Sequence, residues 1–226
     1  MHLPSARVAD CSSAPPSDPR HIWFFRLLAR ITEFTPTVVA VPVARWVLGV
    51  RGVAGMLTYL PTATIERLSL ALPAYFVARV ALALDAPRRE WIADKLPIDA
   101  LVASARELIA LHAFAATAAF AALLPRLTLR EVVVQLHDTT GVAHITGHLN
   151  VDKATEVLTA YTPALAAEIL DEMVRQGYLD LTAAVGHRLP APERQAIETH
   201  VTEETRHALD AEPEGSAMAR QDVADV

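Results

Sequence analysis

Hydrophobic positions recur at helical spacing through most of the chain between residues 21 and 210. The stripe is clearest after Pro163, where apolar residues alternate with acidic ones at intervals of three and four, as on a helix with one buried face. The dipeptides that favour tight hairpin turns, Asn-Gly and Asp-Gly, do not occur in the sequence. The pattern therefore predicts an all-α protein.

Several residues mark where individual helices begin and end. Asp85 and Asn150 precede apolar helical patterns and are expected to cap them, because their side chains can accept a hydrogen bond from the first turn. Pro163 is expected to open the clearest helix, and Gly177 to end it in a left-handed conformation.

Other boundaries follow from the same reasoning. Asp99 is expected to be an N-cap, and Thr128 with Glu131 matches a capping box. The uncharged stretch Leu108–Leu124 predicts one buried helix, whose length is near the lower limit for a membrane span. A last, polar helix is expected from Pro192 to about residue 209.

Prolines divide the chain into units. The steps at residues 96–97, 124–125, 162–163 and 189–190 delimit the segments 97–124, 125–162 and 163–189, each with room for a pair of short helices. Short amphipathic helices bury their apolar faces by stacking on neighbours. We expect an irregular, α-solenoid-like stack of helix pairs over residues 61–210. Before it we expect a disordered leader (1–20) and an apolar, arginine-bearing amphipathic segment (21–60), and after it a disordered tail (211–226).

The segment 21–60 carries the most distinctive surface signal. Apolar and aromatic residues between Ile22 and Ile31 fall on one helical face with arginines alongside, which is typical of a helix lying in a membrane interface. Three alternatives remain open: the aromatic residues cover the first core helices, they contact a membrane surface, or the segment spans the bilayer. The expected membrane or partner contacts are Trp23, Phe24, Phe25, Arg26 and Arg30.

Composition narrows the partners and the compartment. The 226 residues are 52% hydrophobic with a mean hydropathy of +0.27, and their net charge of −6 argues against nucleic acid as a partner. Positive charge is concentrated between His21 and Arg51, a stretch with four arginines and one glutamate. A single cysteine, Cys11, excludes an internal disulfide and fits a reducing compartment. We therefore expect a cytoplasmic protein, peripheral on the inner membrane face, with a protein partner or a second copy of itself and an anionic membrane surface as a further contact.

The stretch from Asn150 to Ile197 carries a family resemblance. Its residues are Ala154, Val157 and Leu158, followed by the run Thr162–Met173 (TPALAAEILDEM). This stretch resembles the helical-repeat N-terminal domain of MgtE-type magnesium transporters, in which short helix pairs are joined at proline steps. Nothing downstream resembles a nucleotide-sensing domain or a transport pore. The resemblance thus implies a regulatory, docking type of domain and not transport, and no magnesium contact is carried over.

Candidate chemistry is sparse. His144 and His148 are four residues apart, a spacing that places two imidazoles on one side of a helix, and with His137 they are the candidate metal ligands. Gly147 interrupts this helix pattern, and Ile145 stands where the HExxH motif has glutamate. Phosphate-binding loops and nucleophile elbows are not found. No cofactor is expected, and the sequence favours a role without catalysis while leaving an enzyme open.

These observations predict a non-enzymatic helical-repeat interaction or adaptor protein attached peripherally to the cytoplasmic membrane face. The alternative is a small-molecule, lipid or metal-binding helical protein that uses His137, His144 and His148. A variant of this alternative is an apolar-ligand carrier in which Ala110–Leu124 lines the cavity.

Overall fold

The computed structural model describes residues 19–93 and 95–211, apart from the side chains of residues 19–25 and of Leu28. Helices account for 79% of this part, and no strand occurs in it, so the all-α prediction is confirmed. The leader and tail predicted at the two ends lie almost entirely outside the described residues.

The helices are short. In chain order they are α1 (Pro19–Phe34), α2 (Thr37–Pro42), the π-helix η1 (Val43–Leu48), α3 (Gly49–Met56), the 3₁₀-helix η2 (Leu57–Tyr59), α4 (Thr62–Ala71), α5 (Ala74–Ala83), α6 (Ala86–Ala93), α7 (Ile98–Ala110), α8 (Phe114–Ala121), α9 (Arg126–Val134), α10 (Thr139–Gly147), α11 (Val151–Leu158), α12 (Pro163–Arg175), α13 (Leu179–Arg188), α14 (Ala191–Glu198) and α15 (Glu203–Asp210).

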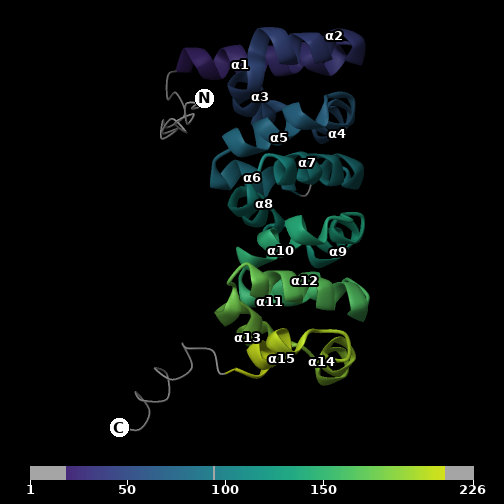
Figure 1. The fold of residues 1–226 in the computed structure, drawn as a ribbon. Coiled ribbons are helices and arrows are strands. Elements are labelled where there is room, and N and C mark those ends of the chain that lie inside the picture. The colour runs from purple at the N-terminus through teal and green to yellow at the C-terminus, as the bar shows by residue number, and fades with distance from the viewer. Residues whose placement is uncertain (1–18, 94, 212–226) are drawn as a thin grey trace, which may run out of the picture.

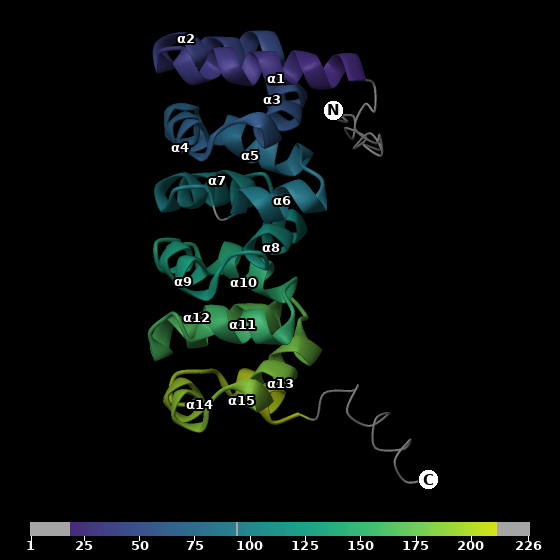
Figure 2. The same cartoon turned by 180° about the vertical axis from the view of Figure 1, so that it is seen from behind.

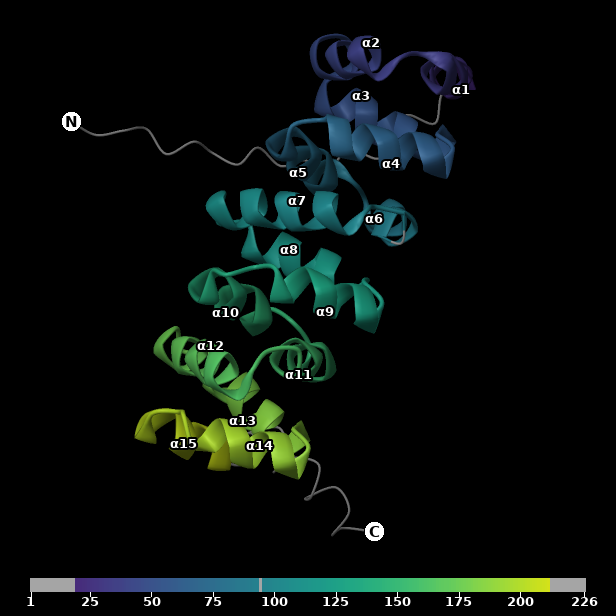
Figure 3. The same cartoon turned by 90° about the vertical axis from the view of Figure 1, so that its right-hand side faces the viewer.

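These helices stack in layers into an elongated column (Figures 1 and 2). Most helices contact the helix two places further along the chain, as α3 contacts α5, α10 contacts α12 and α13 contacts α15. The layer of α1 and α2 forms one end of the column, and the layer of α14 and α15 forms the other, as the side view also shows (Figure 3). The amphipathic segment 21–60 is part of the stack, because α3 also packs on α5.

Prolines begin many of the helices. At the N-cap their ψ angles lie between 138° and 149°, so the backbone is extended just before each helix starts. A proline at a helix start sacrifices no intrahelical hydrogen bond, because the first amides have no partner within the helix. The prolines with this extended conformation at the N-caps of α-helices are Pro36, Pro61, Pro73, Pro97, Pro125 and Pro190.

The helix starts recur along the chain at a nearly constant interval. Helices α4, α9 and α14 begin at Thr62, Arg126 and Ala191. The next four helices, α5 to α8, begin at positions 74, 86, 98 and 114, and their counterparts α10 to α13 begin at positions 139, 151, 163 and 179, so the offset is the same for all four pairs. Counterpart positions are buried alike, such as Thr117 and Thr182. One period therefore contains five helices. It corresponds to one long and one short proline-bounded segment, such as 125–162 followed by 163–189.

Four local predictions are confirmed. The carboxylate of Asp85 and the amide oxygen of Asn150 accept hydrogen bonds from the backbone N–H three residues further on, at 3.2 and 2.8 Å. Pro163 is the first residue of α12. Gly177 has a φ of 87° just after the end of that helix. Each of these residues acts on its own helix terminus, so sequence alone was sufficient to identify it.

The single helix predicted at Leu108–Leu124 is wrong, because the chain turns between α7 and α8. His112 is left-handed, with a φ of 54°. The N–H of Ala113 donates to the carbonyl of Leu108 at 2.9 Å, which satisfies a carbonyl at the end of α7. Tyr178 makes the same bond to Met173 after α12, at 3.0 Å, so His112 occupies the position that Gly177 takes one period later.

Three other boundary predictions are also wrong. Asp99 lies in the first turn of α7, and Thr128 lies inside α9, because the preceding prolines occupy both N-caps. The helix expected from Pro192 to residue 209 is divided into α14 and α15. Thr202 causes the division: its hydroxyl accepts from the N–H of Thr205, while its own N–H donates to Asp171 of α12 at 3.1 Å.

Candidate functional site

The outermost N-terminal layer exposes apolar side chains. On α1, Leu27, Ile31 and Phe34 follow one another at intervals of four and three residues, so they form one stripe, and they are 43%, 54% and 83% exposed. Arg26 and Arg30 are exposed on the flank of this stripe. This stripe is therefore accessible to solvent, and the two arginines border it, while Ala29 of the same helix is buried.

The next two helices continue this exposed surface. Val38 on α2 is 83% exposed, and Trp46 and Val47 on η1 are 80% and 75% exposed. The guanidinium of Arg45 lies 5.6 Å from the ring centroid of Trp46, and it donates to the hydroxyl of Tyr75 at 2.6 Å. These contacts hold a cation beside an exposed indole, an arrangement that suits the headgroup region of a bilayer.

The opposite end of the stack is polar. On α15 the outer positions carry charged side chains, and only Thr205 and Leu209 of that helix are buried. In the described chain beyond residue 190 no large hydrophobic side chain is exposed. Residues 19–72 contain six arginines and two glutamates, whereas residues 191–210 contain two arginines and five acidic residues. The two ends therefore differ in both polarity and charge.

One helical run in the apolar end has the length of a membrane span. The stretch Thr37–Tyr59 has 23 residues and a mean hydropathy of 1.4 in its most apolar window, and 22% of that window is buried. Its length of roughly 34 Å would cover the hydrocarbon core. However, Gly49 has φ 63° and ψ −176°, outside the helical region, and α3 then packs on α5. In this fold the run changes conformation at Gly49, and its second half is part of the stack.

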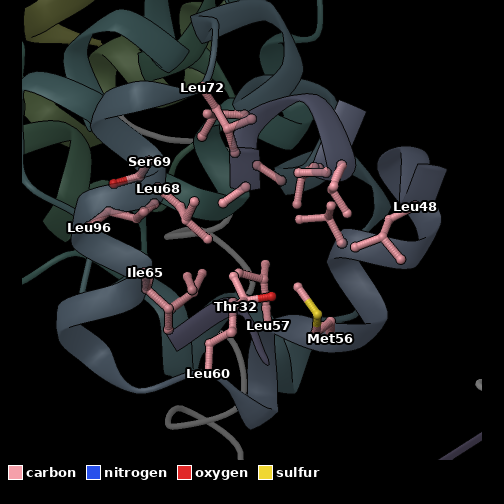
Figure 4. Close-up of a pocket in the computed structure, with 18 of the residues that line it drawn as sticks. Thr32, Leu48, Met56, Leu57, Leu60, Ile65, Leu68, Ser69, Leu72 and Leu96 are labelled. Atoms are coloured by element: carbon pink, nitrogen blue, oxygen red, sulfur yellow. The ribbon is translucent and has the colours of Figure 1, made fainter. Parts of the chain in front are cut away.

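A cavity of about 190 Å³ lies beneath this layer, between α1 and α6. Figure 4 shows side chains from several helices converging on it, including Leu48 and Met56 from one side and Ile65, Leu68 and Leu72 from the other. Two of its few polar side chains are satisfied locally: Thr35 donates to the carbonyl of Ile31 at 2.6 Å and Ser69 to that of Glu66 at 2.9 Å. Such a cavity has few partners for water, which needs two to four polar partners when buried.

An enclosed and unfilled cavity of this size would destabilise a protein by roughly 4.6 kcal/mol, at about 24 cal/mol per Å³. This cavity is partly open beside Ile31 and Val39, so that figure is an upper bound. A second cavity, of about 60 Å³, lies deeper in the stack and shares Val77, Ala81, Leu96 and Phe120 with the first. The stretch Ala110–Leu124, expected to line an apolar cavity, contributes Phe120 to both.

The three candidate histidines do not assemble into one ligand set. Among residues 19–93 and 95–211, no group of three His, Cys, Asp or Glu side chains is arranged to hold a metal ion. His144 stacks on Phe114 with 4.4 Å between ring centroids, and His148 lies 5.9 Å from the ring of Tyr178. His137 borders a separate shallow surface groove. The reason is topological: His144 and His148 face aromatic side chains of the α7–α8 and α12–α13 turns, while His137 precedes α10.

The predicted contact residues are placed only in part. Trp23, Phe24 and Phe25 belong to α1, but their side chains lie outside the description, whereas Arg26 and Arg30 are exposed beside the stripe. Within the segment 21–60, sequence reasoning named no contact residue on α2 or η1, where Val38, Trp46 and Val47 are exposed. A signal was present, because the stretch TVVAVPVARWVL has too few polar positions to provide a solvent face for a helix buried on its other side.

Comparison with models of known families, with curated proteins and with solved structures finds no match for this chain, so the resemblance to the MgtE-type domain stays a prediction.

Proposed function

We propose that this protein is a non-catalytic adaptor that docks on an anionic membrane surface through α1, α2 and η1 and presents the remaining stack to a protein partner. One observation carries the proposal: the terminal layer exposes the stripe of Leu27, Ile31 and Phe34 together with Val38 and Trp46, next to arginines. Stacked helices provide extended side surfaces for a partner.

The charge of this layer favours a membrane over a second copy of the chain. In a two-fold dimer the same patch lies on both sides of the interface, so the arginines of one copy would approach those of the other. An anionic bilayer instead attracts them, by about 1 kcal/mol per basic residue near the surface. The apolar stripe and Trp46 would then lie among the headgroups, as in other amphipathic interfacial helices.

Co-sedimentation with lipid vesicles tests the proposal. We expect binding to vesicles that contain phosphatidylserine, weaker binding to vesicles of phosphatidylcholine alone, and loss of binding at high salt. The double variant Val38→Asp/Trp46→Asp should lose most of the binding. The matched control is Leu127→Asp, because Leu127 is 75% exposed but lies on α9 in the middle of the stack.

Replacing Arg26 and Arg30 by glutamine tests the electrostatic part. Each change should weaken binding to anionic vesicles by roughly fivefold, the equivalent of about 1 kcal/mol. If the parent protein instead ignores vesicles and forms a dimer that Val38→Asp/Trp46→Asp dissociates, the terminal layer is a subunit interface and the membrane proposal is wrong. Analytical ultracentrifugation of the same samples measures this.

A further inference from the structure

We propose that the cavity beneath the terminal layer binds the alkyl chain of a medium-chain fatty acid, whose carboxylate is held by Arg67. The cavity lies between α1 and α6 and is partly open, because Ile31 and Val39 of its wall are also exposed to solvent. This inference goes beyond membrane docking and does not depend on it.

The size of the cavity selects the ligand length. Cores are normally packed as densely as organic crystals and contain few voids larger than a water molecule. A cavity of about 150 Å³ takes the six carbons of benzene, so 190 Å³ holds roughly eight carbon atoms. Longer chains would have to extend into the second cavity past Phe120, which borders both.

The polarity of the wall selects an alkyl chain. Apolar side chains dominate it, and the hydroxyls of Thr35 and Ser69 donate to nearby helix carbonyls, those of Ile31 and Glu66. A ligand with polar groups along its length would bury them without partners, which is unfavourable. An alkyl chain requires no hydrogen bonds inside the cavity and replaces the missing contacts of the wall.

A cation for an anionic head lies next to the cavity, although it is not part of the wall. Arg67 is exposed on α4 and donates to the carbonyl of Thr32, which lines the cavity, at 3.2 Å. A guanidinium has five N–H donors, so further donors stay available after this bond. Arginine binds carboxylates in a two-bond geometry, which makes a fatty acid a better match than an uncharged alcohol. The surplus of arginine over glutamate in residues 19–72 adds to this preference.

Isothermal titration calorimetry without vesicles tests the inference. We expect butyrate to bind weakly, octanoate to bind, and affinity to rise roughly fourfold per added methylene until the chain reaches about eight carbons. Octanol should bind several-fold more weakly than octanoate. Arg67→Gln should remove this difference by weakening octanoate alone.

A cavity-filling variant supplies the second arm. Ala81 lines the cavity on α5, so Ala81→Leu should weaken octanoate binding at least tenfold. Ala83→Leu, at an exposed position of the same helix, should leave it unchanged. Circular dichroism identifies any variant that fails to fold, and the surface variant Arg67→Gln keeps the test decisive in that case.

The outcomes separate the two proposals. If octanoate does not bind, or if octanoate and octanol bind equally and Arg67→Gln changes neither, the fatty-acid site is refuted whatever the vesicles show. If octanoate binds normally to Val38→Asp/Trp46→Asp while vesicle binding is lost, the cavity is an independent site. If only phospholipid vesicles bind, and no soluble acid does, the cavity inference fails while membrane docking stands.

Discussion

Filling the N-terminal cavity should stabilise the protein, and Ala81 is the position at which we would test this. Its side chain lines both cavities from α5, and it is neither fully buried nor fully exposed. Replacement by leucine adds three carbon atoms at a site where the wall lacks contact partners. Leucine also has a high helix propensity, so the helix itself is not penalised.

The expected magnitude follows from the cavity volume. An enclosed cavity of this volume corresponds to at most about 4.6 kcal/mol at 24 cal/mol per Å³. Three of the roughly eight carbons that it can hold would recover about 1.7 kcal/mol of that, and the open side of the cavity lowers the expectation to roughly 1.5 kcal/mol. For a chain of this length the melting temperature should rise by about 3–6 °C.

Urea unfolding followed by circular dichroism measures the change in the free energy of unfolding. The exposed Ala83→Leu is the matched control, because it adds the same atoms to the same helix and should change stability by less than about 0.5 kcal/mol. Stabilisation of Ala81→Leu alone supports the cavity. If Ala81→Leu is instead destabilised by about 1–3 kcal/mol, as in overpacked cores, then the space is already filled in solution and both the volume argument and the ligand inference are refuted.

Three other predictions concern the stack itself. Because residues 112 and 177 both have a left-handed backbone, His112→Gly should stabilise the protein by about 1 kcal/mol and Gly177→Ala should destabilise it by a similar amount. Urea unfolding measures both free energies, and the argument is contradicted if both variants are stabilised or both are destabilised. In Gly186→Ala the new Cβ would lie 2.6 Å from the backbone oxygen of Leu209, so we expect a loss of about 2 kcal/mol, while unchanged stability would show that α15 packs less closely on α13. Burial raises the pKa of the Tyr161 hydroxyl above its ordinary value of 10.0, so its contribution to stability is complete below pH 10 and is lost as the pH rises further. Alkaline titration of tyrosinate absorbance should therefore show a last-ionising step that Tyr161→Phe removes, and persistence of that step in the variant would refute the assignment.

The sequence predicted helix ends where a single side chain determines them. Asp85 and Asn150 cap their helices through their own oxygens, and Gly177 adopts a conformation that few other residues tolerate. The turn at His112 was missed because a histidine gives no local signal for a left-handed backbone. Its position becomes understandable only from the recurrence of helix starts, since the packing of α8 against α10 and of α7 against α9 requires the chain to turn there.

Proline is harder to interpret than glycine. From sequence alone it indicates chiefly where helices end, whereas Pro97 and Pro125 are themselves the N-caps of the helices that follow. The two competing capping predictions, at Asp99 and Thr128, failed because both residues lie inside the first turn of a helix that the proline had already started. A proline step in this chain is therefore best understood as the N-cap or first residue of the helix that follows it.

The candidate site was predictable in its surface and not in its interior. Arg26 and Arg30 beside an apolar stripe follow from helical spacing alone, and the described part of α1 has both features exposed. The cavity has walls drawn from positions as far apart as Ile31 and Phe120. Its volume depends on how several helices meet, and the periodicity of a single helix contains no information about a gap between helices.

The two ends of the stack explain why the unusual features gather at one of them. A helical stack is soluble when its last layer has a polar outer face. At the C-terminal end, Arg194 forms ion pairs with Glu198 and Asp210 and donates to the carbonyl of Gly186 at 3.3 Å, so α13, α14 and α15 are joined by charged groups. At the N-terminal end the corresponding layer is apolar outside, basic at its edges and incompletely packed inside. An unfilled cavity lowers stability and an exposed apolar face marks an interaction surface, and both features lie at the end of the stack that carries the arginines. The two proposed ligands address these features separately: a membrane surface covers the exposed apolar face, and the alkyl chain of a fatty acid fills the cavity while its carboxylate pairs with Arg67.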